Sequence, residues 1–258
     1  MRKRAASWRS AGLPATAMPP AGLAEPGERT RARQRLAVTS LGALAAFAGL
    51  VLLLHAIKPE LDPSWRFLSE YSIGPHGWVM TTAFLAWALS CVMLCGALRD
   101  DLTTRWGRVG LVVLAAVALS LVVAGLFEQD PLTAKPDELT THGTVHAVAS
   151  MVGIPGFPIA ALLITRSLSR HRPQWFAAPR VLMLMAHLTW LSLLAMAVYL
   201  AVAVPRAGGF GPDVQAGWMN RLVVLSYCAW QGAVAYIACR TQDSWRPIST
   251  RSAGLESS

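Results

Sequence analysis

The chain has 258 residues, of which 54% are hydrophobic and only 14% are charged, and its mean hydropathy is +0.43. This composition excludes an ordinary water-soluble domain, because about a quarter of the residues of such a domain are charged. The net charge of +9 does not indicate a nucleic-acid partner, since the basic residues are divided among several segments and no motif that reads DNA or RNA accompanies them.

The N-terminal segment, residues 1–35, mixes Arg, Pro, Ala and Gly without helical periodicity, and we expect it to be a disordered basic cytoplasmic tail. The apolar block that follows has no small-x-small cleavage site, so it is expected to remain as a span rather than to act as a secretory signal. Residues 36–240 are predicted to form a single transmembrane domain, because the connections within this range are too short for a separate soluble domain. Residues 241–258 are expected to form a second disordered cytoplasmic tail.

Six apolar stretches are each long enough to cross a hydrocarbon core ~30 Å thick, which takes about 20 helical residues. In chain order they are Leu36–Ile57, Trp78–Leu98, Val109–Phe127, His142–Thr165, Val181–Val204 and Trp218–Cys239. The sequence therefore predicts an all-α fold, a polytopic transmembrane bundle of six helices.

The distribution of positive charge predicts the orientation of this bundle. Of the 23 Lys and Arg residues, 18 come before the first span, after the last span or in the connections after the second and fourth spans. Because cytoplasmic segments carry the excess of positive charge, the N-terminus and the C-terminus are both expected to be cytoplasmic, in a multi-pass protein of the plasma membrane. Membrane lipids are the expected partners, with the basic tail attracted to anionic headgroups.

Polar side chains with potential chemistry gather on the opposite, outer side. Four of the six histidines lie there, together with eight acidic residues. They are His55, His76, His142 and His146, with Glu60, Asp62, Glu70, Glu128, Asp130, Asp137, Glu138 and Asp213. From this cluster we take five candidate catalytic residues, namely Glu70, Glu128, Asp130, His142 and His146.

Three short elements of this outer side occur in a fixed order. They are Ser69-Glu70-Tyr71, Phe127-x-x-Asp130 and His142-Gly143-x-x-His146. As a set they resemble the bacterial membrane proteins grouped as domain of unknown function 998, over about residues 36–240. The resemblance implies a six-helix fold in a bacterial inner membrane and implies no activity.

The two histidines of the third element, His142 and His146, are four residues apart on a helix and point the same way. Such a pair can chelate a divalent metal if Glu70, His76, Glu128 or Asp130 supplies a third ligand. A metal with an open position would activate water or polarise a lipid or phosphate oxygen. The same side chains also fit ligand, proton or ion handling, or a structural hydrogen-bonded network, and the structural network is our preferred interpretation.

We also make predictions for two features inside the spans, a charged residue and a segment rich in proline and glycine. Arg221 lies one turn inside the last span, and we expect it to pair with an outer carboxylate, Glu70, Glu128 or Asp130. The segment Gly153–Pro158 contains two prolines and two glycines and is expected to kink the fourth span.

Three classes of function remain. The preferred class is a non-enzymatic scaffold or sensor whose outer polar cluster is structural or responds to pH through its histidines. The second is a metal-dependent hydrolase or transferase that acts on lipid or envelope material. The third is a small-solute transporter whose path uses the Gly153–Pro158 segment.

Overall fold

The computed structural model describes residues 26–171, 175 and 179–240. Within these residues the regular structure is entirely helical, so the predicted all-α class is confirmed. The elements are α1 (Pro26–Ile57), the short 3₁₀ helix η1 (Leu68–Ser72), α2 (Gly77–Leu98), α3 (Arg105–Leu126), α4 (Thr141–His171), α5 (Pro179–Ala207) and α6 (Ala216–Arg240).

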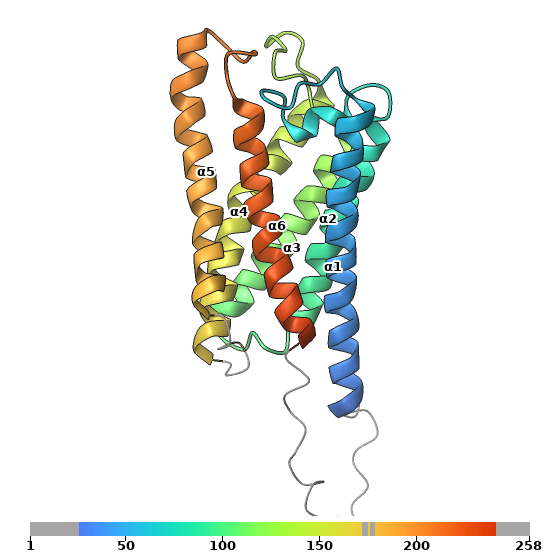
Figure 1. Ribbon diagram of the computed structural model, residues 1–258, viewed down its shortest axis with the longest axis vertical. Helices are drawn as coiled ribbons and strands as arrows, with labels where there is room; N and C mark the ends of the chain where they lie inside the picture. Colours follow the sequence, from blue (N-terminus) through green and yellow to red (C-terminus); the bar gives the residue numbers. More distant parts are fainter. Residues whose placement is uncertain (1–25, 172–174, 176–178, 241–258) are drawn as a thin grey trace, which may run out of the picture.

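The six long helices run up and down and close into a ring. Each helix packs against its neighbours in the sequence, and α6 returns to pack against α1. The described chain begins and ends at the same end of the bundle, with α5 and α1 on opposite flanks (Figure 1). We call the opposite end, formed by η1 and residues 58–76, 127–140 and 208–215, the cap end.

The outer surface of the bundle is apolar. All six helices are long and apolar enough to cross a membrane. Large side chains on their outward faces are more than half exposed, for example Leu52, Val112, Met151, Val198 and Leu225. A water-soluble bundle would bury such side chains, so the chain is a polytopic membrane bundle.

The first helix begins earlier than the sequence predicted. Residues 26–35 were assigned to a disordered tail, but they form the first turns of α1. Arg is a good helix former, and Glu28 lies in the first turn, where a negative charge interacts favourably with the helix dipole. Arg33 also forms an ion pair of 2.7 Å with the buried Asp101, between α2 and α3. Residues 1–25 and the predicted tail 241–258 lie outside the described residues.

Small residues bring α3 and α4 close together. A Cβ atom at Gly110 would lie 2.8 Å from the Ile164 side chain, and one at Gly156 would lie 3.1 Å from Val117. The backbones can approach this closely only because glycine has no side chain, which is how transmembrane helices commonly pack. The α4 helix is continuous through Gly153–Pro158 and forms one wall of the bundle interior.

Four polar side chains in the half of the interior that faces the termini form one hydrogen-bonded network. The indole N–H of Trp87 donates to Oε1 of Gln231 at 2.9 Å, and Nε2 of Gln231 donates to Oγ of Ser90 at 2.7 Å. Ser90 and Ser40 exchange hydroxyl-to-carbonyl hydrogen bonds between α2 and α1. This network fixes α1, α2 and α6 in register, because a buried polar group that lost its partner would be costly in the membrane.

Candidate functional site

The carboxylate of Glu70 holds the cap together. This side chain, on η1, is fully buried. Its Oε1 accepts from Nη1 of Arg66 at 2.8 Å and from the backbone N–H of Leu132 at 3.1 Å, and its Oε2 accepts from the N–H of Phe67 at 2.9 Å. One carboxylate thus joins the loop after α1 to the loop after α3, and Arg66 balances its charge.

Asp130 performs a similar role at the start of α4. Its two carboxylate oxygens accept from the backbone N–H and the hydroxyl of Thr140, at 2.9 and 2.8 Å. A Cβ atom at Gly143 would lie 1.9 Å from Oδ2 of Asp130, so a side chain at this position would displace the carboxylate from Thr140. Ser69 donates a hydrogen bond to Oε1 of Gln129 and adds a second link between η1 and this loop. Glu128 itself is exposed.

The two histidines of α4 have different environments. His142 is exposed and packs on Phe127, with ring centroids 5.2 Å apart. His146 is only 3% exposed, and its Nδ1 lies 2.9 Å from both the Ala124 and Phe127 carbonyl oxygens at the C-terminus of α3. Because a carbonyl oxygen can only accept, Nδ1 carries the hydrogen and Nε2 is left as an acceptor.

The expected metal ligands are not brought together. Across residues 26–171, 175 and 179–240, no group of three or more His, Cys, Asp or Glu side chains is placed to hold a metal ion. The carboxylates of Glu70 and Asp130 are already used by N–H and hydroxyl donors. These contacts of Glu70 and Asp130 are thus hydrogen bonds that join cap segments.

Arg221 is satisfied without a carboxylate, so the predicted pairing with Glu70, Glu128 or Asp130 is wrong. Its Nε donates to Nε2 of His55 at 3.0 Å, and its Nη1 donates to the Arg66 and Gly217 carbonyl oxygens at 2.8 and 3.1 Å. Its Nη2 donates to the hydroxyl of Tyr71 at 3.3 Å. Glu70 is instead the partner of Arg66, whose side chain lies closer to it on the same loop.

A second cation, Lys58, is buried in the cap directly after α1. Its Nζ donates to the Tyr71 and Ile73 carbonyl oxygens at 3.2 and 2.5 Å. Burial lowers the pKa of this ammonium, and the negative charges of Glu60 and Glu128 partly offset that effect. Lys58 therefore fixes the end of η1 to the end of α1.

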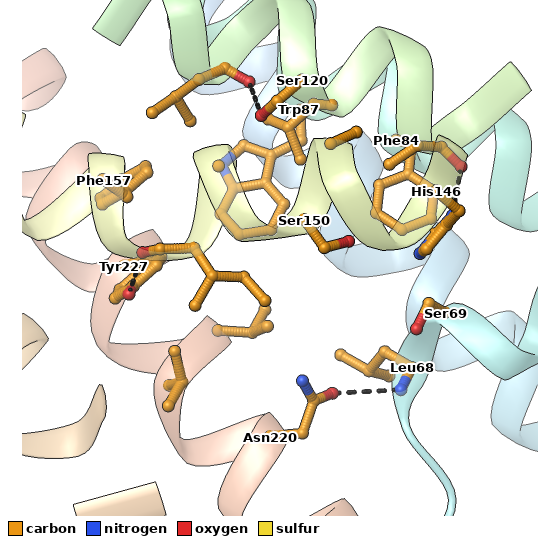
Figure 2. A pocket seen from close by; sticks show the side chains of 18 of the residues that line it. Leu68, Ser69, Phe84, Trp87, Ser120, His146, Ser150, Phe157, Asn220 and Tyr227 are labelled. Atoms are coloured by element: carbon orange, nitrogen blue, oxygen red, sulfur yellow. Dashed lines mark hydrogen bonds between the residues drawn. The ribbon is translucent and has the colours of Figure 1, made fainter. Parts of the chain in front are cut away.

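A cavity with a volume of about 90 Å³ lies beneath the cap, in the centre of the bundle. All six helices contribute to its lining, which is largely apolar and aromatic (Figure 2). At the end of the cavity away from the cap, the ring of Phe157 stacks on that of Tyr227, with ring centroids 4.4 Å apart and ring planes at 6°. The ring centroid of Trp87 lies 6.0 Å from that of Phe157. No Asp, Glu, Lys or Arg is among the residues that line it.

The cavity meets an outer groove at its upper end. The groove has a volume of about 550 Å³ and lies between residues 129–139, the first turns of α4 and Phe67. Five residues line both spaces, namely Ser69, His146, Ser150, Ile154 and Asn220, and we call them the mouth. Val148 and Met151 line the groove and are 58% and 76% exposed, so the groove opens on the side of α4 that faces lipid.

The comparison with known proteins identifies the family of the chain. A family profile described as "Protein of unknown function (DUF998)" matches residues 15–237. This chain belongs to the DUF998 family. The resemblance inferred from the three ordered elements is thereby confirmed. No curated protein and no solved structure matches the chain.

In this DUF998 protein, the three elements are parts of one cap. Ser69 and Glu70 contact the loop after α3, Asp130 contacts the start of α4, and His146 contacts the end of α3. Asn220 and Ser150, which line the mouth, are absent from the residues predicted for the site, and His55 was predicted at the outer side but not as the partner of Arg221. A polar residue beside Arg221 within an apolar span was the available signal for Asn220.

Proposed function

We propose that this DUF998 protein binds an apolar ligand from the surrounding membrane, in the cavity beneath a structural polar cap. The observation that carries the proposal is the uncharged aromatic cavity in the centre of a membrane bundle, next to a groove on a lipid-facing side with which it shares the five mouth residues. Ligand sites are typically apolar cavities with a few well-placed polar groups, and this cavity has that character.

We further propose that the termini are cytoplasmic and that the cap faces outward in the plasma membrane. The support is the charge distribution along the sequence, since 18 of the 23 Lys and Arg residues come before the first span, after the last span or in the connections after the second and fourth spans. In this orientation the groove lies at the level of the outer leaflet, and the ligand would enter from there. The cap would close the site to water, and its occupancy would give the sensory role that the outer cluster suggested.

The geometry supports binding better than hydrolysis or transport. A hydrolase would need a reactive cluster, whereas Glu70, Asp130 and Nδ1 of His146 are engaged in hydrogen bonds that hold the cap. A transporter would need a polar path beyond Gly153–Pro158, whereas the Phe157 and Tyr227 stack ends the cavity at that level. Binding requires only the space that is present.

Photo-crosslinking tests this function. The full-length protein in nanodiscs is incubated with a long-chain alkane that carries a diazirine, and the labelled residues are mapped by mass spectrometry. We expect label on Phe157 and Tyr227 in the cavity. The Ala149→Phe substitution fills the cavity and should abolish this label, whereas Ala116→Phe, the same change at an exposed site on α3, should preserve it.

If Ala149→Phe does not give a monodisperse protein, Ala149→Leu is the milder filling variant. Label confined to lipid-facing residues of the wild type would contradict the proposal. Cavity labelling that is unchanged in a folded Ala149 variant would contradict it as well.

A further inference from the structure

The mouth of the cavity contains a hydrogen-bond acceptor on the side chain of His146, a residue that lines both the cavity and the groove. His146 uses Nδ1–H for the carbonyl oxygens of α3, so its Nε2 presents a lone pair. His146 is 3% exposed, lines both the cavity and the groove, and directs its ring toward the space between α4 and α6 (Figure 2). Among the described residues, no hydrogen bond to Nε2 is formed.

A donor lies on the opposite side of the mouth. Oδ1 of Asn220 accepts from the backbone N–H of Leu68 at 3.1 Å, and a backbone N–H can only donate, so this assignment of the amide is fixed. The NH₂ group of Asn220 therefore points away from Leu68 and toward the cavity (Figure 2). Ser150 adds a hydroxyl between these two residues on the same lining.

The charge of the site disfavours an anionic head group. The cavity lining contains no charged residue, and the one carboxylate of the groove, Asp130, is held by Thr140. A phosphate or carboxylate placed at the mouth would be buried without a counter-ion. A head group with hydroxyls suits the site, because one hydroxyl can donate to Nε2 of His146 and another can accept from the NH₂ of Asn220.

The dimensions favour one narrow apolar chain. The cavity, at about 90 Å³, is smaller than the ~150 Å³ apolar cavity that binds one benzene molecule, so it takes the end of a single chain rather than two. The groove above it is larger and carries Gln129 and Thr144, which suit a polar head. A lipid with its head group in the groove and its chain pointing toward Phe157 would have the same orientation as a lipid of the outer leaflet, with its chain toward the centre of the bilayer.

From this geometry, and resting on the proposed function, we propose that the ligand is a single-chain lipid with an uncharged hydroxyl head group, as in a monoacylglycerol. His146 and Asn220 at the mouth recognise its hydroxyls, and the aromatic cavity receives its chain. No bond is made or broken in this recognition.

The test compares two probes that differ only in their hydroxyl groups. One is a monoacylglycerol with a diazirine in its chain, and the other is the dimethyl ether of the same molecule. Both are titrated into full-length protein in phosphatidylcholine nanodiscs, and label on Phe157 and Tyr227 is quantified. We expect the monoacylglycerol to reach half-maximal cavity labelling at about one-tenth of the concentration that the ether needs.

Asn220→Asp removes the donor: it keeps the oxygen that accepts from Leu68 and replaces the NH₂ group by an oxygen, and any effect of the added charge would act on both probes alike. It should raise the half-maximal concentration of the monoacylglycerol about tenfold and leave that of the ether unchanged. Gln215→Glu makes the same chemical change at an exposed position outside the cavity lining and should alter neither probe.

The outcomes separate the two proposals. Equal labelling by both probes in the wild type would overturn recognition of the hydroxyl and leave the binding function standing. Cavity labelling by neither probe would overturn both. A monoacylglycerol preference that persists unchanged in a folded Asn220→Asp variant would overturn the assignment of Asn220.

Discussion

Arg221 shows how this protein keeps a guanidinium within a membrane-spanning helix. The group has five N–H donors, and at the cap end of α6 these meet carbonyl oxygens, an imidazole nitrogen and a phenol. Dipoles fixed by the cap replace water, so the charge needs no carboxylate at contact distance. The sequence-based prediction considered only carboxylates as partners of Arg221. Backbone carbonyl oxygens occur at every residue, so the sequence does not indicate which of them will accept from the guanidinium.

Glu70 should be the most sensitive residue of the cap. The Glu70→Gln substitution removes the negative charge that faces Arg66. It also replaces one carboxylate oxygen by an NH₂ group, which cannot accept the hydrogen bond that this oxygen receives from a backbone N–H. We expect a loss of about 3 kcal/mol, which is the size of effect seen when a buried ion pair is broken. In detergent, Tm should fall by roughly 5–10 °C.

The matched control is Glu60→Gln, which makes the same change at an exposed position two residues beyond Lys58. Its Tm should stay within about 1 °C of the wild type. Equal Tm values for the two variants would show that the carboxylate of Glu70 does not stabilise the cap.

Tyr71 should give the cap a pH-dependent stability. Burial raises the pKa of its phenol above the usual 10.0, and the positive charge of Arg221 opposes this effect in part. The folded protein thus keeps the phenolic proton to higher pH than the unfolded chain does. The stability contributed by the neutral phenol is fully present below about pH 10 and is lost as the pH rises through the folded-state pKa.

Tyr71→Phe removes the hydrogen bond from the hydroxyl to the Leu61 carbonyl, so it should destabilise the protein by about 1 kcal/mol at pH 8. The Tm difference from the wild type should narrow above pH 10, because phenylalanine has no proton to lose. The lowered pKa of Lys58 affects both proteins alike and cancels in the difference. A Tm difference that is constant from pH 7 to pH 11 would contradict this explanation.

At the scale of the elements, α4 contains two prolines and yet continues for 31 residues. Pro158 has no N–H, so the carbonyl of Ile154, four residues earlier, loses its helical partner. The hydroxyl of Tyr227 on α6 donates to this carbonyl at 2.7 Å. The carbonyl that Pro158 leaves without a partner in α4 thus forms a hydrogen bond between α4 and α6, in the wall of the cavity.

A double-mutant cycle tests this link. Tyr227→Phe keeps the ring stacked on Phe157 but leaves the Ile154 carbonyl unsatisfied, which should cost about 1–2 kcal/mol. Adding Pro158→Ala restores an N–H that can bond the same carbonyl within α4. We expect the double variant to be more stable than Tyr227→Phe alone, with a coupling energy of about 1 kcal/mol. Strictly additive changes in Tm would rule out a shared carbonyl.

The helices could be predicted from the sequence because the membrane requires long uninterrupted apolar stretches. All six expected spans are helices, and their ends at Ile57 and Leu98 agree with the sequence prediction. The start of α1 could not be predicted in the same way, since residues 26–35 are polar and helical. Their order depends on a contact between Arg33 and Asp101, which are distant in the sequence.

At the scale of the whole molecule, the sequence located the candidate site but did not reveal its chemistry. It placed Glu70, Asp130 and His146 at one end of the bundle, and these three join the cap segments. The sequence could not show that His146 caps α3 while His142 is exposed. The four-residue spacing places both side chains on the same face of the helix, but it does not show how deeply each one is buried. The cavity was also beyond prediction, since all six helices contribute to its lining.

The orientation of the bundle decides which leaflet supplies the ligand, and it can be measured directly. The four native cysteines lie in α2 and α6, so a variant with all four replaced by alanine gives a background without reactive thiols. Glu138→Cys places a thiol on the exposed loop of the cap, and Thr103→Cys places one on the exposed connection at the other end. The positive-inside distribution predicts that a membrane-impermeant maleimide labels Glu138→Cys in intact cells and labels Thr103→Cys only after lysis.

A detergent-lysed sample of each variant serves as the control for thiol reactivity, because both positions should then be labelled to the same extent. The reverse pattern in intact cells would place the cap in the cytoplasm. The mouth formed by His146 and Asn220 would then face the inner leaflet, and a hydroxyl-bearing lipid would have to enter from that leaflet. Since the cavity, the groove and their lining are unchanged by this reversal, binding would survive it, and only the source of the ligand would change.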